Sequence, residues 1–272
     1  MDLINKSVQW LITCSNEIGI NVIAGLTASI IVLFSQTLVK TAALIIASLF
    51  SIKFQLSKIW QIRRPQRIYV VSGSIGVDVP TEIKTAILAG PDADAASSVI
   101  ATLGLLYPQA EIQHVYSSSF PREEYKENLV IIGGPVNNQC AASFLDYVKD
   151  RAHYTKDFEF VTNNSRYSTQ YDKNQHSILD YGVIIRITNP FNNARDVIII
   201  SGCDTHGVLA AATLISSKNE TKVARRKLRS FLGLKSYFYQ QDYVAVIECA
   251  VLGNTIGHIK TKEVLHINKN EK

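Results

Sequence analysis

The sequence predicts an α/β protein in which an N-terminal transmembrane helix precedes a Rossmann-like, mostly parallel sheet with a C-terminal β-hairpin. Three observations carry this prediction. An uncharged apolar stretch lies near the N-terminus, apolar runs then alternate with helical stretches, and two alternating runs close the chain. We place the boundary after residue 64, so that residues 1–64 form a membrane anchor and residues 65–272 a cytoplasmic α/β domain.

The membrane anchor is predicted from the stretch IGINVIAGLTASIIVLFSQ, residues 18–36. It has no charged residue and is long enough to cross a hydrocarbon core of roughly 30 Å as a helix. A second apolar stretch, residues 41–52, follows it. No Gly or Pro occurs in residues 27–61, which favours one helix that continues to residue 60 over two spans. A helix buried in a protein core is the alternative.

The residues that flank this stretch predict its orientation. Lys6 before it is offset by Asp2 and Glu17. Basic residues cluster after it, namely Lys53, Lys58, Arg63, Arg64 and Arg67. The positive-inside rule therefore places the globular domain in the cytoplasm, beneath the inner or plasma membrane. The basic cluster, together with Trp60, is also suited to contact anionic headgroups, so membrane lipid is an expected partner.

The anchor helix is expected to self-associate. Gly25, Ala28 and Ser29 are small residues of the kind that let membrane helices approach closely, which predicts a homo-oligomer. Gln36 and Lys40 are polar residues within the apolar region, which suggests an oligomeric contact or a pore lining rather than exposure to lipid. Alternatively, Lys40 extends to the cytoplasmic interface.

The α/β domain is predicted from the alternation that begins at residue 67. Runs such as NLVIIGG and DVIIISG are almost continuously apolar, as expected of strands covered by helices on both faces. Helices are predicted at residues 92–106, 138–152 and 206–217. Alternation of this kind predicts a Rossmann-like parallel sheet. The last two runs, separated by NTI, predict an antiparallel hairpin at residues 242–268.

Three turns that follow predicted strands supply the candidate ligand-binding residues. In open α/β sheets, ligands bind outside the carboxyl ends of the strands, and glycines and helix N-termini suit phosphate or carboxylate groups. The candidates are Gly73, Gly133, Gly134, Asn137, Ser201, Gly202, Asp204, Thr205 and His206. We therefore predict a site for a small anionic, nucleotide-like ligand. The same residue types are also ordinary turn and N-cap residues, so a purely structural connection is the alternative.

No strong catalytic or nucleotide-binding motif accompanies these turns. GSIGVD is not GxGxxG, and neither GxxxxGK[ST] nor GxSxG occurs. His206 is a candidate general base only if the hydroxyl of Ser72 or Ser201 converges on it. Asp92 and Asp94 are possible metal ligands, yet no partner for them is identifiable, and the four cysteines form no CxxC pair. We expect no cofactor and no metal, and the sequence favours a protein without enzymatic activity.

The stretch TKVARRKLR, residues 221–229, does not predict nucleic-acid binding. No aromatic residue lies among its basic residues, and the net charge of the chain is only +5. A solvated helix face, or contact with anionic lipid, is expected instead.

Residues 128–216 show a family resemblance. The segments NLVIIGGPVNN and DYGVIIRITNPFNNARDVIIISGCDTHGVLAAATLI resemble the S-layer outer-domain-like Rossmannoid module of prokaryotic membrane-anchored proteins. In that module a GGP-x-N turn precedes an NPF stretch and a strand that ends in a Gly-rich turn and a helix. The resemblance implies an α/β module whose turns pack or bind, and it transfers no catalytic residue.

Three functions are compatible with these features. The first is a membrane-anchored sensor or effector whose cytoplasmic domain binds a small anionic ligand. The second is a membrane-anchored hydrolase that uses the Ser/Asp/His turns. The third is a non-catalytic membrane scaffold.

Overall fold

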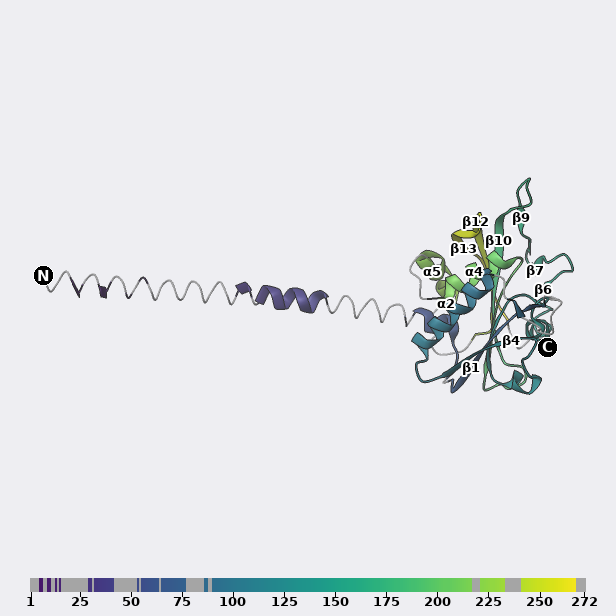
Figure 1. The fold of residues 1–272 in the computed structure, drawn as a ribbon, viewed down its shortest axis with the longest axis horizontal. Coiled ribbons are helices and arrows are strands. Elements are labelled where there is room, and N and C mark those ends of the chain that lie inside the picture. Colours follow the sequence, from purple (N-terminus) through teal and green to yellow (C-terminus); the bar gives the residue numbers. More distant parts are fainter. Residues whose placement is uncertain are drawn as a thin grey trace. The chain divides into compact units, whose positions relative to one another are not determined.

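The computed structural model describes residues 5–6, 9–10, 13, 15, 29–30, 32–41, 53, 55–63, 65–76, 86–87, 90–216, 221–232 and 241–267. The chain divides into two compact units, Met1–Ile52 and Lys53–Lys272, and the second carries the sheet (Figure 1). In the first unit, residues 32–41 are helical. The hydroxyls of Thr37 and Thr41 donate to backbone carbonyls one turn earlier in this helix.

The predicted fold class is wrong in two respects. First, no helix within the described part of the chain is long and apolar enough to cross a membrane. Much of the predicted span at residues 18–36 lies outside the described residues, as do Gly25 and Ala28 of the predicted oligomeric contact. Second, the main sheet is mixed rather than mostly parallel.

The main sheet has the strand order β13-β12-β10-β11-β5-β1-β4, with β9 paired to β10. Four neighbouring strands are parallel: β11 (Asp196–Gly202), β5 (Asn128–Ile132), β1 (Arg67–Ser72) and β4 (Glu111–Tyr116). The others pair antiparallel: β9 (Gln170–Tyr171), β10 (Ser177–Thr188), β12 (Tyr243–Leu252) and β13 (Thr255–His266). The predicted C-terminal hairpin is therefore confirmed, and it forms one edge of the sheet.

The mixed topology has a simple cause. β10 and β11 are joined by a short turn, and such a connection makes neighbouring strands antiparallel, whereas a parallel pair needs a longer crossover. β11 is buried over all but its last residue, and β10 is buried at residues 180–187. A continuous apolar run therefore predicts that a strand is buried on both faces, but it does not predict whether the strand is parallel or antiparallel to its neighbours.

Helices and a small sheet cover the main sheet. α2 (Gly90–Leu106) and α4 (Thr205–Ile215) pack against each other and against the strands, and α5 (Lys222–Leu232) lies against β13 (Figure 1). A second group comprises η1 (Arg122–Lys126), α3 (Gln139–Leu145) and the sheet of β6 (Ala152–Tyr154), β7 (Phe160–Thr162) and β8 (Arg166–Tyr167). The strands β2 (Ile75–Gly76) and β3 (Ala86–Ile87) form a separate pair. Helix α3 ends at Leu145, so the helix predicted at residues 138–152 is shorter than expected.

Alternate residues of a strand point to opposite faces of the sheet, and in the central strands β1, β5 and β11 the residues on both faces are buried. Tyr69, Leu129 and Ile199 share one hydrophobic cluster with Phe144 of α3 and Phe160 of β7. The intervening strand residues are buried as well, on the face that α2 and α4 cover.

Helix α4 lies unusually close to β10. A Cβ atom at Gly182 would clash with the carbonyl oxygen of Gly207 and lie 2.9 Å from Cβ of Ala211. Only glycine fits at such an approach. This contact fixes the start of α4, and with it the turn after β11.

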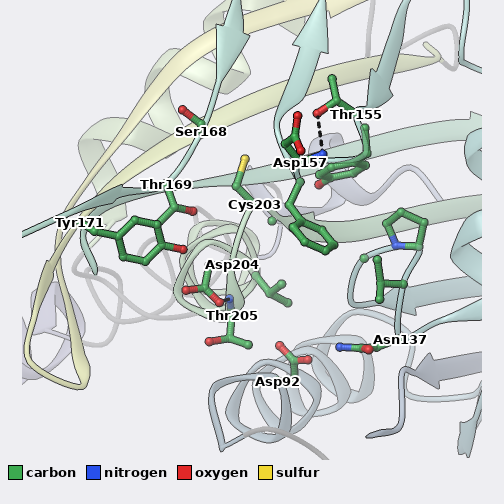
Figure 2. A pocket seen from close by; sticks show the side chains of 17 residues that line it. Asp92, Asn137, Thr155, Asp157, Ser168, Thr169, Tyr171, Cys203, Asp204 and Thr205 are labelled. Atoms are coloured by element: carbon green, nitrogen blue, oxygen red, sulfur yellow. Dashed lines mark hydrogen bonds between the residues drawn. The ribbon is translucent and has the colours of Figure 1, made fainter. Parts of the chain in front are cut away.

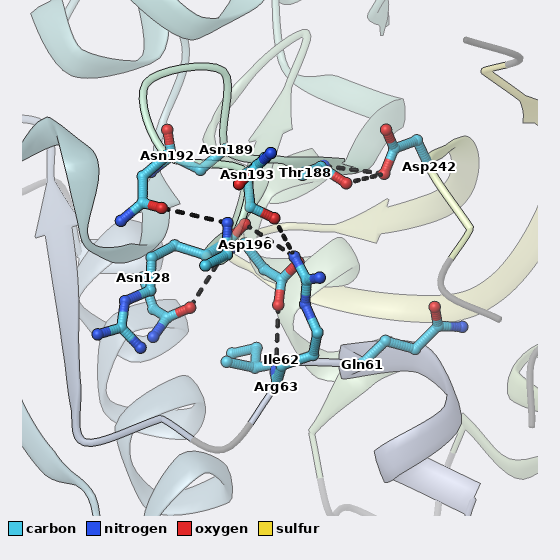
Figure 3. A network of polar contacts seen from close by, with 12 residues as sticks. Gln61, Ile62, Arg63, Asn128, Thr188, Asn189, Asn192, Asn193, Asp196 and Asp242 are labelled. Atoms are coloured by element: carbon cyan, nitrogen blue, oxygen red, sulfur yellow. Dashed lines mark hydrogen bonds and ion pairs between the residues drawn. The ribbon is translucent and has the colours of Figure 1, made fainter. Parts of the chain in front are cut away.

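A buried polar network ties the segment before β1 to the sheet. Arg186 of β10 is fully buried, and its guanidinium donates to the carboxylates of Asp196 at 2.6 Å and Asp242 at 2.7 Å. The backbone N–H of Arg63 donates to Asp196 at 3.0 Å, and that of Asp196 donates to the side chain of Asn128 at 3.1 Å (Figure 3). Residues 55–63 are consequently part of the globular unit.

Trp60 does not lie at a lipid interface. Its side chain is fully buried and its indole N–H donates to the carbonyl of Ile215 at the end of α4, at 2.9 Å. The expectation that Trp60 contacts headgroups is therefore wrong. The sequence suggested a lipid contact because tryptophan beside basic residues is typical of membrane interfaces.

The NPF stretch has a structural role. The side-chain amide of Asn189 donates to the carbonyls of Tyr125 and Glu127, at 2.8 and 2.7 Å. The ring of Phe191 contacts those of Tyr125 and Phe144. The stretch therefore anchors the β10–β11 turn to η1 and α3.

Candidate functional site

A cavity of about 380 Å³ opens at the carboxyl ends of the parallel strands (Figure 2). The turn after β5 contributes Gly134 and Asn137, the last residue of β11 contributes Gly202, and the first turns of α2 and α4 contribute Asp92 and Thr205. Helix α3 follows β5 and helix α4 follows β11, and these helices lie on opposite faces of the sheet. The cavity therefore lies at a topological switch point, where ligands bind in open α/β sheets.

The opposite wall comes from the small sheet and from the approach to β9. Tyr154, Thr155 and Phe158 line the cavity from the β6–β7 hairpin, and Thr169 and Tyr171 line it from the segment after β8. Phe158 is 55% exposed and Tyr171 is 51% exposed. Two large rings thus lie partly in solvent beside an open cavity.

The structure brings most of the predicted binding residues to this cavity. Its lining includes Gly134, Asn137, Gly202, Asp204 and Thr205. The remaining candidates, Gly73, Gly133, Ser201 and His206, lie outside the lining and act within the surrounding turns. This is the structural alternative that the sequence also allowed for these turn and N-cap residue types.

The GGPVNN turn is held in place from within. Gly133 has a φ of +102°, a conformation that glycine adopts readily. A Cβ atom at Gly73 would lie 2.8 Å from the carbonyl oxygen of Asn137. The side-chain amide of Asn138 donates to the carbonyls of Val71 and Ile132, and its oxygen accepts from the N–H of Ala141, capping α3. These contacts present Gly134 and Asn137 to the cavity.

Ser201 supports the wall of the cavity. Its side chain is fully buried, and its Oγ lies 2.8 Å from the phenolic oxygen of Tyr154, which lines the cavity. Burial raises the pKa of Tyr154 well above its usual value, so this hydroxyl stays neutral. The pair fixes the hairpin of the small sheet against the end of β11.

Asp204 caps α4 and also lines the cavity. Its carboxylate accepts a hydrogen bond from the backbone N–H of Thr205 at 2.7 Å. A carboxylate at this position satisfies a free helix N–H and interacts favourably with the helix dipole. The anion site offered by the N-terminus of α4 is therefore occupied by the protein's own side chain.

Asp92, which the sequence suggested only as a possible metal ligand, lines the cavity although it was not among the predicted ligand-binding residues. It lies in the first turn of α2, is only 8% exposed, and its Oδ1 has no hydrogen-bond partner among the described residues. Burial, followed by the negative charge of Asp204, raises the pKa of Asp92 from 3.8 to about 6. Its place in the first turn of the helix after β1 was the sequence signal that could have identified it.

The charges around the cavity are of one sign. Asp92, Asp157 and Asp204 all line it, whereas no lysine, arginine or histidine does so in the part of the chain that the structure describes. No group of three or more His, Cys, Asp or Glu side chains suited to a metal ion occurs among those residues either. The site therefore offers hydrogen-bond acceptors and negative charge.

The predicted acid–base arrangement does not form in these turns. Nδ1 of His206 is buried without a hydrogen-bond partner among the described residues. The hydroxyl of Ser201 pairs with Tyr154, and Oγ of Ser72 lies 2.9 Å from Nε2 of His114 at the β1–β4 pair. Cys203 lines the cavity, but burial raises the pKa of its thiol to about 12, which disfavours the reactive thiolate.

No family model and no curated protein matches this chain. The resemblance of residues 128–216 to an S-layer outer-domain-like module therefore stays a prediction. The fold and site define a mixed α/β domain with a switch-point cavity. The geometry of that cavity alone carries the functional argument.

Proposed function

We propose that the globular unit is a binding domain for a small organic ligand, which occupies the cavity at the ends of β5 and β11. The observation that carries this proposal is the position of an open cavity of about 380 Å³ at the switch point of the sheet. Its volume falls in the usual range for small-molecule sites, and both polar groups and aromatic rings line it.

Two features support binding over a purely structural connection. A βα connection needs no buried carboxylate without a partner, and such a group lowers the stability of the folded state. Asp92 is buried, and its Oδ1 has no hydrogen-bond partner in the part of the chain that the structure describes. A connection also needs no exposed rings around a cavity, yet Phe158 and Tyr171 are both more than half exposed there. A ligand would use both features.

The remaining parts of the expected function stay predictions. These are the membrane location, the cytoplasmic side, self-association and a role as sensor or effector. A helix N-terminus by itself favours an anionic ligand, but at α2 and α4 the carboxylates of Asp92 and Asp204 oppose one. The hydrolase alternative gains no support from the turns, because the hydroxyl of Ser201 pairs with Tyr154.

Ligand binding can be tested by a thermal-shift screen of the full-length chain, because a ligand that binds only the folded state raises its melting temperature. Gly134→Val places a side chain in the cavity wall. A Cβ there would lie 3.6 Å from Oγ of Ser201, an ordinary contact, so we expect the variant to fold. Gly104→Val is the matched control, at an exposed helix position with no neighbour within 4 Å.

We expect at least one compound to raise the melting temperature of the wild type and of Gly104→Val, and to have no effect on Gly134→Val. A folded wild type that responds to no compound would favour the scaffold alternative. Equal responses in all three proteins would place binding elsewhere.

A further inference from the structure

We infer, on the basis of the proposed function, that the ligand presents a positively charged, hydrogen-bond-donating nitrogen to Asp92 and Asp204. The class is an organic ammonium or amidinium compound. The inference depends on three features of the cavity: its charge, an unsatisfied acceptor and its aromatic rim.

The charge of the cavity selects a cation. Three carboxylates line it, and none of the described lining residues carries a basic side chain. At the N-terminus of α4, the position that would attract an anionic ligand already holds the carboxylate of Asp204, bonded to the N–H of Thr205. An anionic ligand would therefore meet a negative charge at the N-terminus of α2 and at the N-terminus of α4.

The unsatisfied acceptor selects a nitrogen that carries hydrogen. Asp92 is more than nine-tenths buried, it lines the cavity, and its Oδ1 has no hydrogen-bond partner among the described residues (Figure 2). Nearly all buried polar atoms in proteins have a partner, which a ligand or water can supply. An N–H of a charged nitrogen would both satisfy this oxygen and compensate the buried charge.

The organic nature of the cation follows from the remaining lining. Among the described residues no group of three metal-ligating side chains exists, so the arrangement does not fit a tightly held metal ion. The rings of Phe158 and Tyr171 at the cavity instead offer apolar surface and π faces, to which ammonium groups are attracted.

The experiment measures binding of matched probes to the full-length chain by calorimetry and by ligand-detected NMR. Each skeleton is supplied with a cationic, a neutral and an anionic end. The probes are phenethylamine, 2-phenylethanol and 3-phenylpropionate, and tryptamine, tryptophol and indole-3-propionate. The trimethylammonium derivative of phenethylamine keeps the charge but has no N–H. The protein variants are Asp92→Asn and, as control, Asp94→Asn, which makes the same change at an exposed position of α2.

We expect the amines to bind at least tenfold more tightly than their neutral and anionic partners. Binding should weaken at least tenfold in Asp92→Asn and stay unchanged in Asp94→Asn, and the trimethylammonium compound should bind more weakly than phenethylamine. Neutral or anionic probes that bind as well as amines would overturn the inference and leave the proposed function standing. Absence of binding by all probes overturns the inference, and the proposed function falls as well only if the thermal-shift screen is also negative.

Discussion

The buried carboxylate of Asp92 makes a quantitative prediction for the pH dependence of stability. Burial and the charge of Asp204 raise the pKa of Asp92 from 3.8 to about 6 in the folded state. Above pH 6 the group is ionised in both the folded and the unfolded chain, and the folded chain carries the full cost of the buried charge. Below pH 4 it is protonated in both, and the cost is absent. Its contribution therefore makes the protein less stable as the pH rises from 4 to 6.

The size of this effect follows from the shift in pKa. About two pKa units, at about 1.4 kcal/mol each, correspond to roughly 3 kcal/mol as an upper limit. Asp92→Asn removes the charge and keeps the shape. The variant should be more stable than the wild type by about 1–3 kcal/mol at pH 7.5, and the difference should disappear near pH 4. Removing this carboxylate of the proposed site is thus expected to stabilise the protein, as is typical where a site is maintained at a cost in stability.

The assay is urea unfolding between pH 4 and 8, followed by the fluorescence of the buried Trp60. Trp10→Phe removes the other indole of the chain from the signal. Asp94→Asn, at an exposed position on the same helix, is the control and should follow the wild type. A free energy of unfolding that is lower in Asp92→Asn by the same amount at every pH would refute the reasoning, because it would mean that the carboxylate stabilises the fold.

Two further predictions concern the fold. Gly104→Ala should stabilise the protein by about 0.5–1 kcal/mol, because this exposed helix position has open space. Gly182→Ala should destabilise it by more than about 2 kcal/mol, because the added Cβ clashes with α4. Thermal unfolding of the two variants measures this difference. Asp196→Asn should cost about 2–4 kcal/mol, because it weakens the buried pair with Arg186, whereas Asp146→Asn in an exposed pair should cost under about 0.5 kcal/mol. Equal losses in chemical denaturation would contradict this difference.

The sequence predicted the local structure of the site better than the topology of the sheet. The N-cap at Asp204, the turn glycines and the C-terminal hairpin are determined by neighbouring residues, and all were predictable. Strand direction is not a local property. The short apolar runs LVII at residues 129–132 and VII at residues 183–185 look alike, yet the first belongs to a strand between parallel neighbours and the second to a strand between antiparallel neighbours.

The composition of the cavity was only partly predictable for a similar reason. Gly134, Asn137 and Gly202 follow predicted strands, so the switch-point rule identified them. Phe158 and Tyr171 reach the cavity from the small sheet and the β9 segment, which no local pattern connected to the ends of β5 and β11. The sign of the charge became evident only when Asp92 and Asp204 were seen to line the same space.

The most direct test of the central claim is to ask whether the cavity retains a small molecule from a mixture. The full-length wild type, Gly134→Val and Gly104→Val would be immobilised, incubated with a total small-molecule extract and washed, and the bound compounds quantified by mass spectrometry. Our account predicts a compound that the wild type and Gly104→Val retain and Gly134→Val does not. Identical sets of retained compounds on all three proteins would contradict it.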